Sequence, residues 1–427
     1  MLSVLILFLV LMCLNVPIAF AIGVSSALFF VTTPGLSLKV AVNTIATASQ
    51  TFSLLAVPFF VLAGNLMNGT GITKRMVRFA TVCTGHLRGG LGHVNILLST
   101  LMGGVSGSAA ADAAMESRVL GTAMIKRGYS RGYTSAVTAM SSLITATIPP
   151  SVGLILYGTV GEVSIGRLFI AGLIPGICLM IGEMICASIR AHKLGYEPVN
   201  DRRPYAKEIF KSLFDCFWAL LFPVILLVGI RMGVFTPSEA GAFAVVYAFI
   251  VGKFIYRELT WKGMIDVIKN TAIDNGVIML IIMCSGPFGY GMSYDRLPQA
   301  ISTWLLGLTS NPTLIVLIIL IFFVIVGCFM EATVNVLLLT PIFLPIVKTL
   351  GFDPVWFGVL MMGIVTVGGM TPPVGVTMYT TCSILKCPVE EYVKEMLPFL
   401  WSVFIVYGVL FIFPDLVTCL PNLVYGS

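Results

Sequence analysis

The sequence predicts an all-α polytopic membrane protein made of inverted repeats, each with a re-entrant helical hairpin and a broken helix. Three observations lead to this fold class. First, 58% of the 427 residues are hydrophobic and only 10% are charged, whereas soluble domains carry about 25% charged residues. Second, glycine clusters and Pro-Pro pairs interrupt the long apolar runs. Third, these interruptions return at a constant spacing later in the chain.

Composition also excludes several classes of protein. The net charge is +6, but the basic residues fall in short loops between apolar runs. We therefore expect the lipid bilayer, and no nucleic acid, as a partner. The ten cysteines are scattered and show no C-x-x-C spacing. They are expected to be small buried hydrophobic side chains rather than metal ligands or disulfides.

An internal repeat organises the chain. Matching residues of the two copies, with their separations, are Gly104 and Gly327 (223), Pro149 and Pro372 (223), Gly64 and Gly286 (222), and Tyr157 and Tyr379 (222). Backbone inside lipid stays helical unless it lines a cavity or lies buried in protein, because unpaired backbone groups there are costly. Paired interruptions in two halves therefore indicate the binding site of a transporter.

The first half is expected to cover residues 1–189. Leu2–Val31 is interpreted as a retained transmembrane helix, because no Lys or Arg precedes its apolar run as in a signal peptide. Two apolar arms within residues 91–124 are each short for a full span and have basic flanks, which a re-entrant hairpin explains. The other expected elements are an interfacial arm at 37–49, a span at 54–67, a basic connection at 74–88, a broken helix at 133–160 and a returning helix at 168–189.

The second half is expected to cover residues 212–427 and to repeat this order. Residues 190–211 are the longest polar segment and are predicted to be a cytoplasmic linker that tolerates change. The expected elements after it are scaffold helices at 213–230 and 240–255, an arm at 261–269, a span at 272–291, a connector at 294–308, hairpin two at 313–350, a broken helix at 355–381 and a last helix at 397–420.

The distribution of basic residues predicts the topology. Five loops that the proposed spans place on one side hold 19 of the 25 Lys and Arg residues: 74–88, 126–131, 190–211, 253–269 and 386–394. By the positive-inside rule this side is cytoplasmic. Hairpin one then enters from the cytoplasm and hairpin two from outside, so the two halves are inverted relative to each other.

The two breaks predict two cation sites. Tips and breaks expose carbonyl and hydroxyl oxygens that lack helical partners, and oxygen-only clusters suit a hard cation such as Na⁺ better than a transition metal. The candidate Na⁺ ligands are Ser106, Gly107, Ser108, Thr145, Thr147 and Pro149 in the first copy, and Glu331, Ala332, Thr366, Gly368, Thr371, Pro372 and Gly375 in the second. The alternative is close helix packing through small residues.

The breaks also predict where an anionic substrate would bind. Half-helices that begin after each break would point their partial positive charge at the midplane, which favours a carboxylate. The candidate substrate-binding residues are Ser108, Asp112, Pro150, Ser151, Thr333, Asn335 and Thr377. Asp112 and Glu116 share one helix face, and charges at membrane depth are functional candidates. The alternative for both is an ion pair or cap that steadies the hairpin arm.

At these residues the sequence resembles the large membrane subunit of tripartite ATP-independent periplasmic (TRAP) transporters. The motifs that carry the resemblance are Gly103–Asp112, Thr147–Ser151 and Thr371–Gly375. The resemblance covers essentially the whole chain and is greatest to the sialic acid branch. It implies the fold of the ion transporter superfamily, an elevator mechanism, Na⁺ coupling and a place in the bacterial inner membrane.

The resemblance also implies partners. These are a periplasmic substrate-binding protein that delivers an organic acid and a small four-helix membrane subunit. The small subunit is expected as a separate chain, because the extra N-terminal helices of fused relatives are missing here.

Two other functions remain open from the sequence. A stand-alone Na⁺-coupled dicarboxylate transporter of the same superfold would need no partner chain. A membrane-embedded enzyme could use Asp112 and Glu116 as paired carboxylates. We find no H-E-x-x-H, G-x-S-x-G or Walker motif, so the protein is not expected to be an enzyme.

Overall fold

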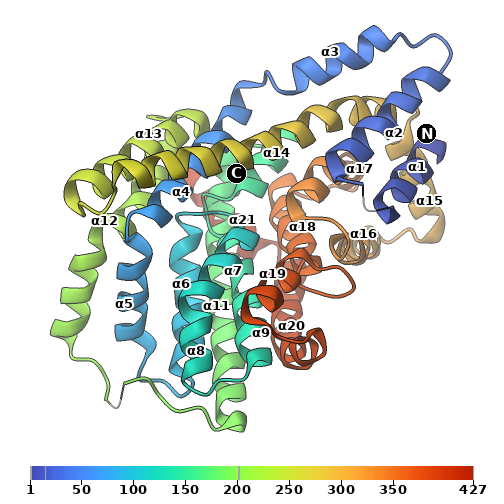
Figure 1. Ribbon diagram of the computed structural model, residues 1–427. Coiled ribbons are helices and arrows are strands. Elements are labelled where there is room, and N and C mark those ends of the chain that lie inside the picture. The colour runs from blue at the N-terminus through green and yellow to red at the C-terminus, as the bar shows by residue number, and fades with distance from the viewer. Residues whose placement is uncertain (1, 15, 201, 427) are drawn as a thin grey trace.

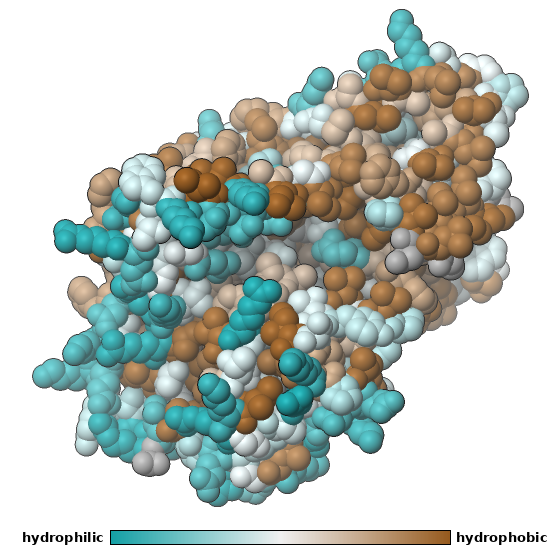
Figure 2. Space-filling model, viewed as in Figure 1, coloured by the Kyte–Doolittle hydropathy of each residue, from teal (hydrophilic) through white to brown (hydrophobic). Residues whose placement is uncertain are grey.

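The computed structural model describes residues 2–14, 16–200 and 202–426, and every regular element within them is a helix (Figure 1). Seven of these helices are long and apolar enough to cross a membrane, and two further pairs qualify as bent or re-entrant spans. Hydrophobic side chains cover much of the surface around the N-terminal helices, as expected for contact with lipid (Figure 2). The predicted all-α membrane fold is confirmed.

The repeat extends over most of the chain. The first copy contains α3 (Leu38–Ala48), α4 (Ala56–Gly69), α5 (Ile72–Thr84), α6 (Gly90–Gly103), α7 (Ala109–Glu116), α8 (Thr122–Lys126), α9 (Arg131–Thr147), α10 (Val152–Val160) and α11 (Ile165–Leu194). The second contains α14 (Trp261–Tyr294), α15 (Leu297–Leu308), α16 (Pro312–Gly327), α17 (Ala332–Thr349), α18 (Pro354–Gly368), α19 (Val376–Leu385) and α20 (Val389–Ile412). A shift of 223 carries the first residue of α7, 109, to that of α17, 332, and the first residue of α9, 131, to that of α18, 354.

Five further α-helices complete the described residues. These are α1 (Leu2–Cys13), α2 (Ile18–Thr32), α12 (Ala206–Arg231), α13 (Pro237–Ile250) and α21 (Asp415–Tyr425). Much of the surface of α12 and α14 is exposed, and α14 packs against α2, α3 and α4. In Figure 1, α14 runs across the molecule above the bundle of vertical helices.

Each copy contains the predicted hairpin and broken helix. Hairpin one consists of α6 and α7, joined by a tip at residues 104–108, and continues through a π-helical turn at Ser117–Gly121 into α8. Hairpin two consists of α16 and α17, joined by residues 328–331. α9 and α10 form the first broken helix, with a bend of 45°, and α18 and α19 form the second. The Pro149–Pro150 and Pro372–Pro373 peptide bonds are both cis.

The core lies where the two broken helices meet. α9 is buried from Gly132 to Thr147 and α18 from Val355 to Gly368, and the two helices are in contact. The Tyr157 hydroxyl of α10 donates a hydrogen bond of 2.7 Å to the Pro354 carbonyl of the other copy. Gly358 admits the Tyr157 ring, because a Cβ at that position would overlap it. The hairpins and broken helices, α6 to α10 and α16 to α19, are called the transport body below.

Polar contacts join the five basic loops at one end of the molecule. Arg88 contacts His192 at 2.8 Å, and the Arg190 guanidinium donates to Glu395. The Arg131 guanidinium donates to the Lys386 carbonyl at 2.9 Å, and Arg75 pairs with Glu258 at 2.8 Å. The expectation that these loops share one side is therefore consistent with the packing of the helices.

Four boundaries differ from the sequence prediction. The apolar run Leu2–Val31 is divided into α1 and α2, because Pro17 has no N–H to continue a helix and starts α2 instead. The expected arm 261–269 and the span after it form one helix, α14, since no glycine or proline lies between residues 264 and 275. The expected last helix 397–420 ends at Ile412, because Pro414 separates α20 from α21.

The fourth difference from the sequence prediction concerns the bounds of the linker. Of the described linker residues only 195–200 and 202–205 lie outside helices, because α11 and α12 extend into the predicted 190–211 segment. Asn200 also ties the linker to the end of α5, since its N–H donates to the Gly85 carbonyl and its side chain to the Thr81 carbonyl. Tolerance to change is therefore not expected at this residue. Asp201 lies outside the described residues.

The contact between hairpin two and its broken helix generates a stability prediction. A Cβ at Gly327 would lie 2.5 Å from the Val365 carbonyl oxygen and 3.0 Å from Gly368 Cα. We expect Gly327→Ala to destabilise the purified protein by about 1–3 kcal/mol, because a tightly packed backbone contact must open. The matched control is Gly276→Ala in α14, where a Cβ meets nothing within 4 Å. Equal thermal unfolding midpoints for the two variants would contradict this packing.

Candidate functional site

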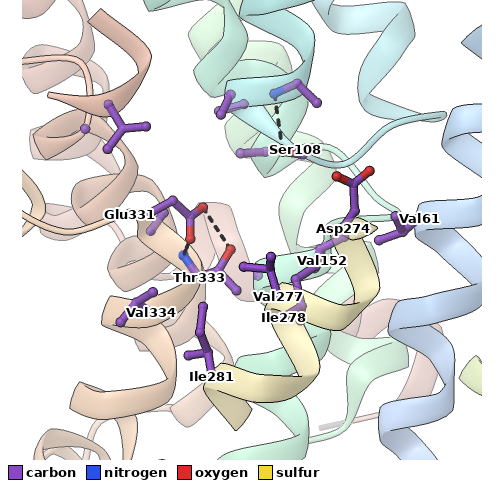
Figure 3. Close-up of a pocket in the computed structure, with 18 of the residues that line it drawn as sticks. Val61, Ser108, Val152, Asp274, Val277, Ile278, Ile281, Glu331, Thr333 and Val334 are labelled. Atoms are coloured by element: carbon purple, nitrogen blue, oxygen red, sulfur yellow. Dashed lines mark hydrogen bonds between the residues drawn. The ribbon is translucent and has the colours of Figure 1, made fainter. Parts of the chain in front are cut away.

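A cavity of about 680 Å³ lies where the two hairpin tips face α4 and α14 (Figure 3). Its polar lining comes from the tips, the broken helices and the two facing helices. These residues are Asn65, Asn68, Ser106, Ser108, Asp274, Glu331, Thr333, Thr366 and Thr377. Apolar side chains of α14 and of the transport body, such as Val277, Ile281 and Met362, form most of the remainder. Segments far apart in the sequence therefore meet at one site, as the repeat predicted.

The first tip is shaped by Gly107. Its φ of +60° is unfavourable for residues with a side chain, and a Cβ here would overlap the Pro150 carbonyl. The Gly107 carbonyl accepts a hydrogen bond of 3.4 Å from the Val152 N–H, the first residue of α10. Ser108 then caps α7, and Ser151 caps α10 through its hydroxyl. The tip and the break are thus held together, with two capped helix N-termini beside them.

The second tip is also hydrogen bonded to its break, but through different residues. The Gly375 N–H donates a hydrogen bond of 3.0 Å to the Cys328 carbonyl. Gly375 lies 223 residues after Val152 and is therefore its counterpart in the second copy. Glu331 caps α17 by accepting from the N–H and the hydroxyl of Thr333, both at 2.9 Å (Figure 3). Ser108 and Glu331 are also 223 residues apart. The cap at this position is therefore neutral in one copy and acidic in the other.

Asp112 and Asn335, again 223 apart, are buried in the transport body. One Asp112 carboxylate oxygen accepts a hydrogen bond of 2.7 Å from Thr145, while its other oxygen has no partner among the described residues. The Asn335 amide donates to the Met330 carbonyl at 3.0 Å, and its oxygen also lacks a partner there. Two matched positions thus each hold a buried, unpaired oxygen, and such atoms cost free energy unless something binds them.

Glu116 lies in a polar layer behind the first tip, which Thr145 links to Asp112 by contacting both the Ser99 carbonyl and the Asp112 carboxylate. It accepts a hydrogen bond of 3.0 Å from Ser99, whose hydroxyl also contacts Ser141 at 3.0 Å. The Ser141 hydroxyl in turn donates to Asn95. Neither Glu116 nor any of the residues linked to it lines the cavity. Among the described residues Glu116 makes neither an ion pair nor a side-chain helix cap, so its role stays a prediction.

Sequence reasoning missed the face of the cavity formed by α4 and α14. The Asn65 amide donates hydrogen bonds of 3.1 Å to both Thr271 and Asp274. Asp274 projects from α14 on the side of the cavity opposite Glu331 (Figure 3). A signal was present in the sequence, since Asp274 is an acidic residue within a helix that is long and apolar enough to span the membrane.

The predicted site residues divide into two groups. Those that line the cavity are Ser106, Gly107, Ser108, Glu331, Ala332, Thr333, Thr366 and Thr377. Those that lie elsewhere in the tips and breaks, without lining it, are Asp112, Thr145, Thr147, Pro149, Pro150, Ser151, Asn335, Gly368, Thr371, Pro372 and Gly375. Thr147 donates to a carbonyl of its own helix, and Thr371 contacts Cys328 at 3.1 Å. The structure thus brings both predicted sets to one region but places only part of each at the cavity surface.

The electrostatics of the cavity are unusual for an anion site. Its described lining contains the carboxyl groups of Asp274 and Glu331 and no Lys, Arg or His side chain. The described residues also contain no group of three His, Cys, Asp or Glu side chains able to hold a metal ion. The polar lining offers hydroxyl, amide and carboxyl oxygens, which are the ligand types that hard cations prefer.

Comparison with known proteins identifies the family. Residues 5–416 match the family model described as "Tripartite ATP-independent periplasmic transporter, DctM component". The chain belongs to this family. The large permease is 37% identical to the sialic acid TRAP transporter large permease protein SiaM of Vibrio cholerae, over 96% of both chains. It is 33% identical to the 2,3-diketo-L-gulonate TRAP transporter large permease protein YiaN of Escherichia coli, over 95% of both.

The fold of the large permease also occurs beyond its family. The YdaH transporter of Alcanivorax borkumensis superposes with a TM-score of 0.54 and 13% identity, over 94% of this chain and 97% of that one. At this identity the likeness concerns the fold alone. The resemblance inferred from the glycine and proline motifs is thus confirmed at the level of the family.

The tip geometry generates a prediction on transport. We expect Gly107→Ala to lower uptake by about tenfold or more, because displacement of a binding geometry by about 1 Å can cost that much. The control is Gly128→Ala, since Gly128 also has positive φ (+88°) but a Cβ there meets nothing within 4 Å. Both variants should still co-purify with the small subunit. If Gly107→Ala takes up substrate at the wild-type rate, the first tip is not part of the transport site.

Proposed function

We propose that this large permease carries out Na⁺-coupled uptake of an organic acid, with sialic acid as the substrate. In this proposal a periplasmic binding protein delivers the acid, and a separate four-helix membrane subunit completes the transporter in the bacterial inner membrane. The family match supports the tripartite assembly. The similarity to SiaM over nearly the whole chain supports sialic acid.

One observation carries the proposed coupling. The cavity presents two acidic side chains and no basic side chain among its described lining residues. An organic anion entering it would be repelled unless cations were bound nearby, because charges in a poorly hydrated site interact strongly. Bound Na⁺ ions would supply that charge, and the N-termini of α7, α10, α17 and α19 would add partial positive charge.

The residues around the tips fit Na⁺. In the first copy, unpaired oxygens of Ser106 and Asp112 lie beside the bend between α9 and α10. In the second, the unpaired oxygen of Asn335 lies in the first turn of α17, where the Asn335 amide contacts the tip at Met330. Hydroxyl, carboxyl and amide oxygens are hard ligands, and the carbonyls of half-helix C-termini commonly complete such sites. We propose one Na⁺ site in each copy, from the ligand sets predicted by the sequence.

The size of the cavity suits a small organic acid. About 680 Å³ lies within the range of roughly 300–1,000 Å³ found for small-molecule sites. Three alanines at the start of α7, Ala109 to Ala111, line the wall beside Ser108 and leave room for such a molecule.

We also propose that transport occurs by an elevator movement. The transport body is tightly packed, since a Cβ at Gly103 would lie 2.7 Å from Ile148, and one at Gly153 would overlap Met362. The faces of α4 and α14 that line the cavity consist largely of small and apolar side chains, with Asn65, Asn68 and Asp274 as the polar ones. A rigid body can slide along such a surface at lower cost than along one fixed by many hydrogen bonds. The long helix α14 and the arm α3 would brace the scaffold.

The coupling test is uptake of labelled sialic acid into proteoliposomes that contain this chain, the small subunit and the binding protein. We expect the rate to rise steeply with Na⁺ concentration, with a Hill coefficient above one, because two ions must bind before the anion is stabilised. A matched experiment replaces the Na⁺ gradient by a proton gradient. Full uptake with protons alone would overturn Na⁺ coupling, and uptake of dicarboxylates but not sialic acid would overturn the substrate.

Topology is tested by cysteine labelling in intact cells. Asn200 is unsuitable as the labelling site because it is hydrogen bonded to α5, so the exposed Glu197 of the same linker is used. With a thiol reagent that cannot cross the membrane, we expect Glu197→Cys to be labelled only after the membrane is made permeable. The exposed Lys348, which contacts the Gly161 carbonyl at the other end of the molecule, gives the opposite result as Lys348→Cys. Reversed labelling would place the basic loops outside the cell.

A further inference from the structure

A second cavity lies far from the hairpin tips, between α5, the linker and the start of α12. Its volume is about 650 Å³, and its lining is mostly polar. It lies among the basic loops, where Figure 2 shows hydrophilic residues over α5, the linker and the beginning of α12. The transport mechanism proposed above makes no use of it.

The charges in this cavity leave a net positive balance. The Arg202 guanidinium donates two hydrogen bonds to Glu208, at 2.7 and 3.3 Å. Arg78 lies 3.7 Å from Asp215. Lys211 has no ion pair among the described residues, and its charge is therefore uncompensated. The two pairs preserve the shape of the site, while Lys211 gives it affinity for an anion.

A buried polar side chain also lines this cavity. Ser212 lines it and is only 4% exposed, yet its hydroxyl oxygen has no hydrogen-bond partner among the described residues. A buried hydroxyl without a partner is uncommon and costs free energy. An oxygen-rich anion such as a phosphate would satisfy it at the same time as it neutralises Lys211.

The surface beside the cavity is suited to a lipid rather than to a soluble anion. Lys211, Phe214 and Trp218 follow one another at spacings of three and four residues, so they form one stripe on α12. Phe214 is 79% exposed and Trp218 is 39% exposed. Basic residues at headgroup level followed by aromatic residues toward the apolar part of a span are typical of a membrane boundary.

We propose that this cavity binds the phosphate headgroup of an anionic phospholipid, whose acyl chains lie along Phe214 and Trp218. The headgroup contacts Lys211 and Ser212 of α12 and Arg78 of α5. The lipid therefore connects a helix of the first half with the first helix of the second half. Basic pockets between membrane helices bind acidic headgroups by this same combination of charge and hydrogen bonding.

The test is native mass spectrometry of the detergent-purified chain, titrated with phosphatidylglycerol or with phosphatidylcholine of the same acyl chains. Wild-type protein should prefer phosphatidylglycerol. The double variant Arg78→Gln/Lys211→Gln should weaken its binding by about 20- to 30-fold, since each basic side chain contributes about fivefold. The control Lys126→Gln/Arg127→Gln removes the same charge from exposed residues at the C-terminal end of α8 that do not line the cavity.

Three outcomes would overturn the proposal. Equal binding of the two lipids by the wild-type protein would show that the cavity does not select an acidic headgroup. An equal loss in both double variants would indicate general surface charge. Displacement of phosphatidylglycerol by inorganic phosphate at the same concentration would assign the cavity to a soluble anion. Because the measurement does not involve transport, its result is independent of the function proposed above.

Discussion

The structure depends on how backbone groups are satisfied where helices break inside the membrane. Lipid offers no hydrogen bonds, so each interruption needs partners from the protein itself. In both copies an N–H at the start of the second half-helix bonds to a carbonyl of the hairpin tip, from Val152, the first residue of α10, to Gly107 and from Gly375, the N-cap of α19, to Cys328. A tip without its break, or a break without its tip, would leave polar backbone unpaired. Hairpin and broken helix are therefore one structural unit.

This unit also explains the site. Because each tip is bound to its break, four helix N-termini and the C-terminal ends of their partner helices are held within one buried region. Such ends offer partial charges of both signs, which can stabilise an anion and cations together. The two copies are not identical in chemistry, since Ser108 caps one arm and Glu331 the other, while Asp112 is matched by Asn335. The repeat supplies the geometry, and these differences give each copy its own charge.

The second half of the cavity comes from outside the transport body. α14 presents Asp274, Val277, Ile278 and Ile281 toward the tips, with Asn65 of α4 fixing the Asp274 carboxyl (Figure 3). The cavity thus lies at the contact between a compact body and a more exposed framework. The second cavity lies elsewhere, beside the start of α12. The linker borders it and is held to α5 through Asn200. The two cavities are formed by different principles, one by helix ends and one by charged surface residues.

The sequence by itself determined the helical membrane fold, the repeat and the position of both breaks, because glycine, proline and long apolar runs act locally on the backbone. It also identified the family and the residues of both tips. It could not show that Asp112 and Asn335 lie behind the cavity surface. Nor could it show that Asn65 and Asp274, which are more than 200 residues apart in the chain, both line the cavity and bond to each other. Those facts depend on which helix faces pack together. The division of Leu2–Val31 and the fusion of the second arm into α14 were also decided only by the folded chain.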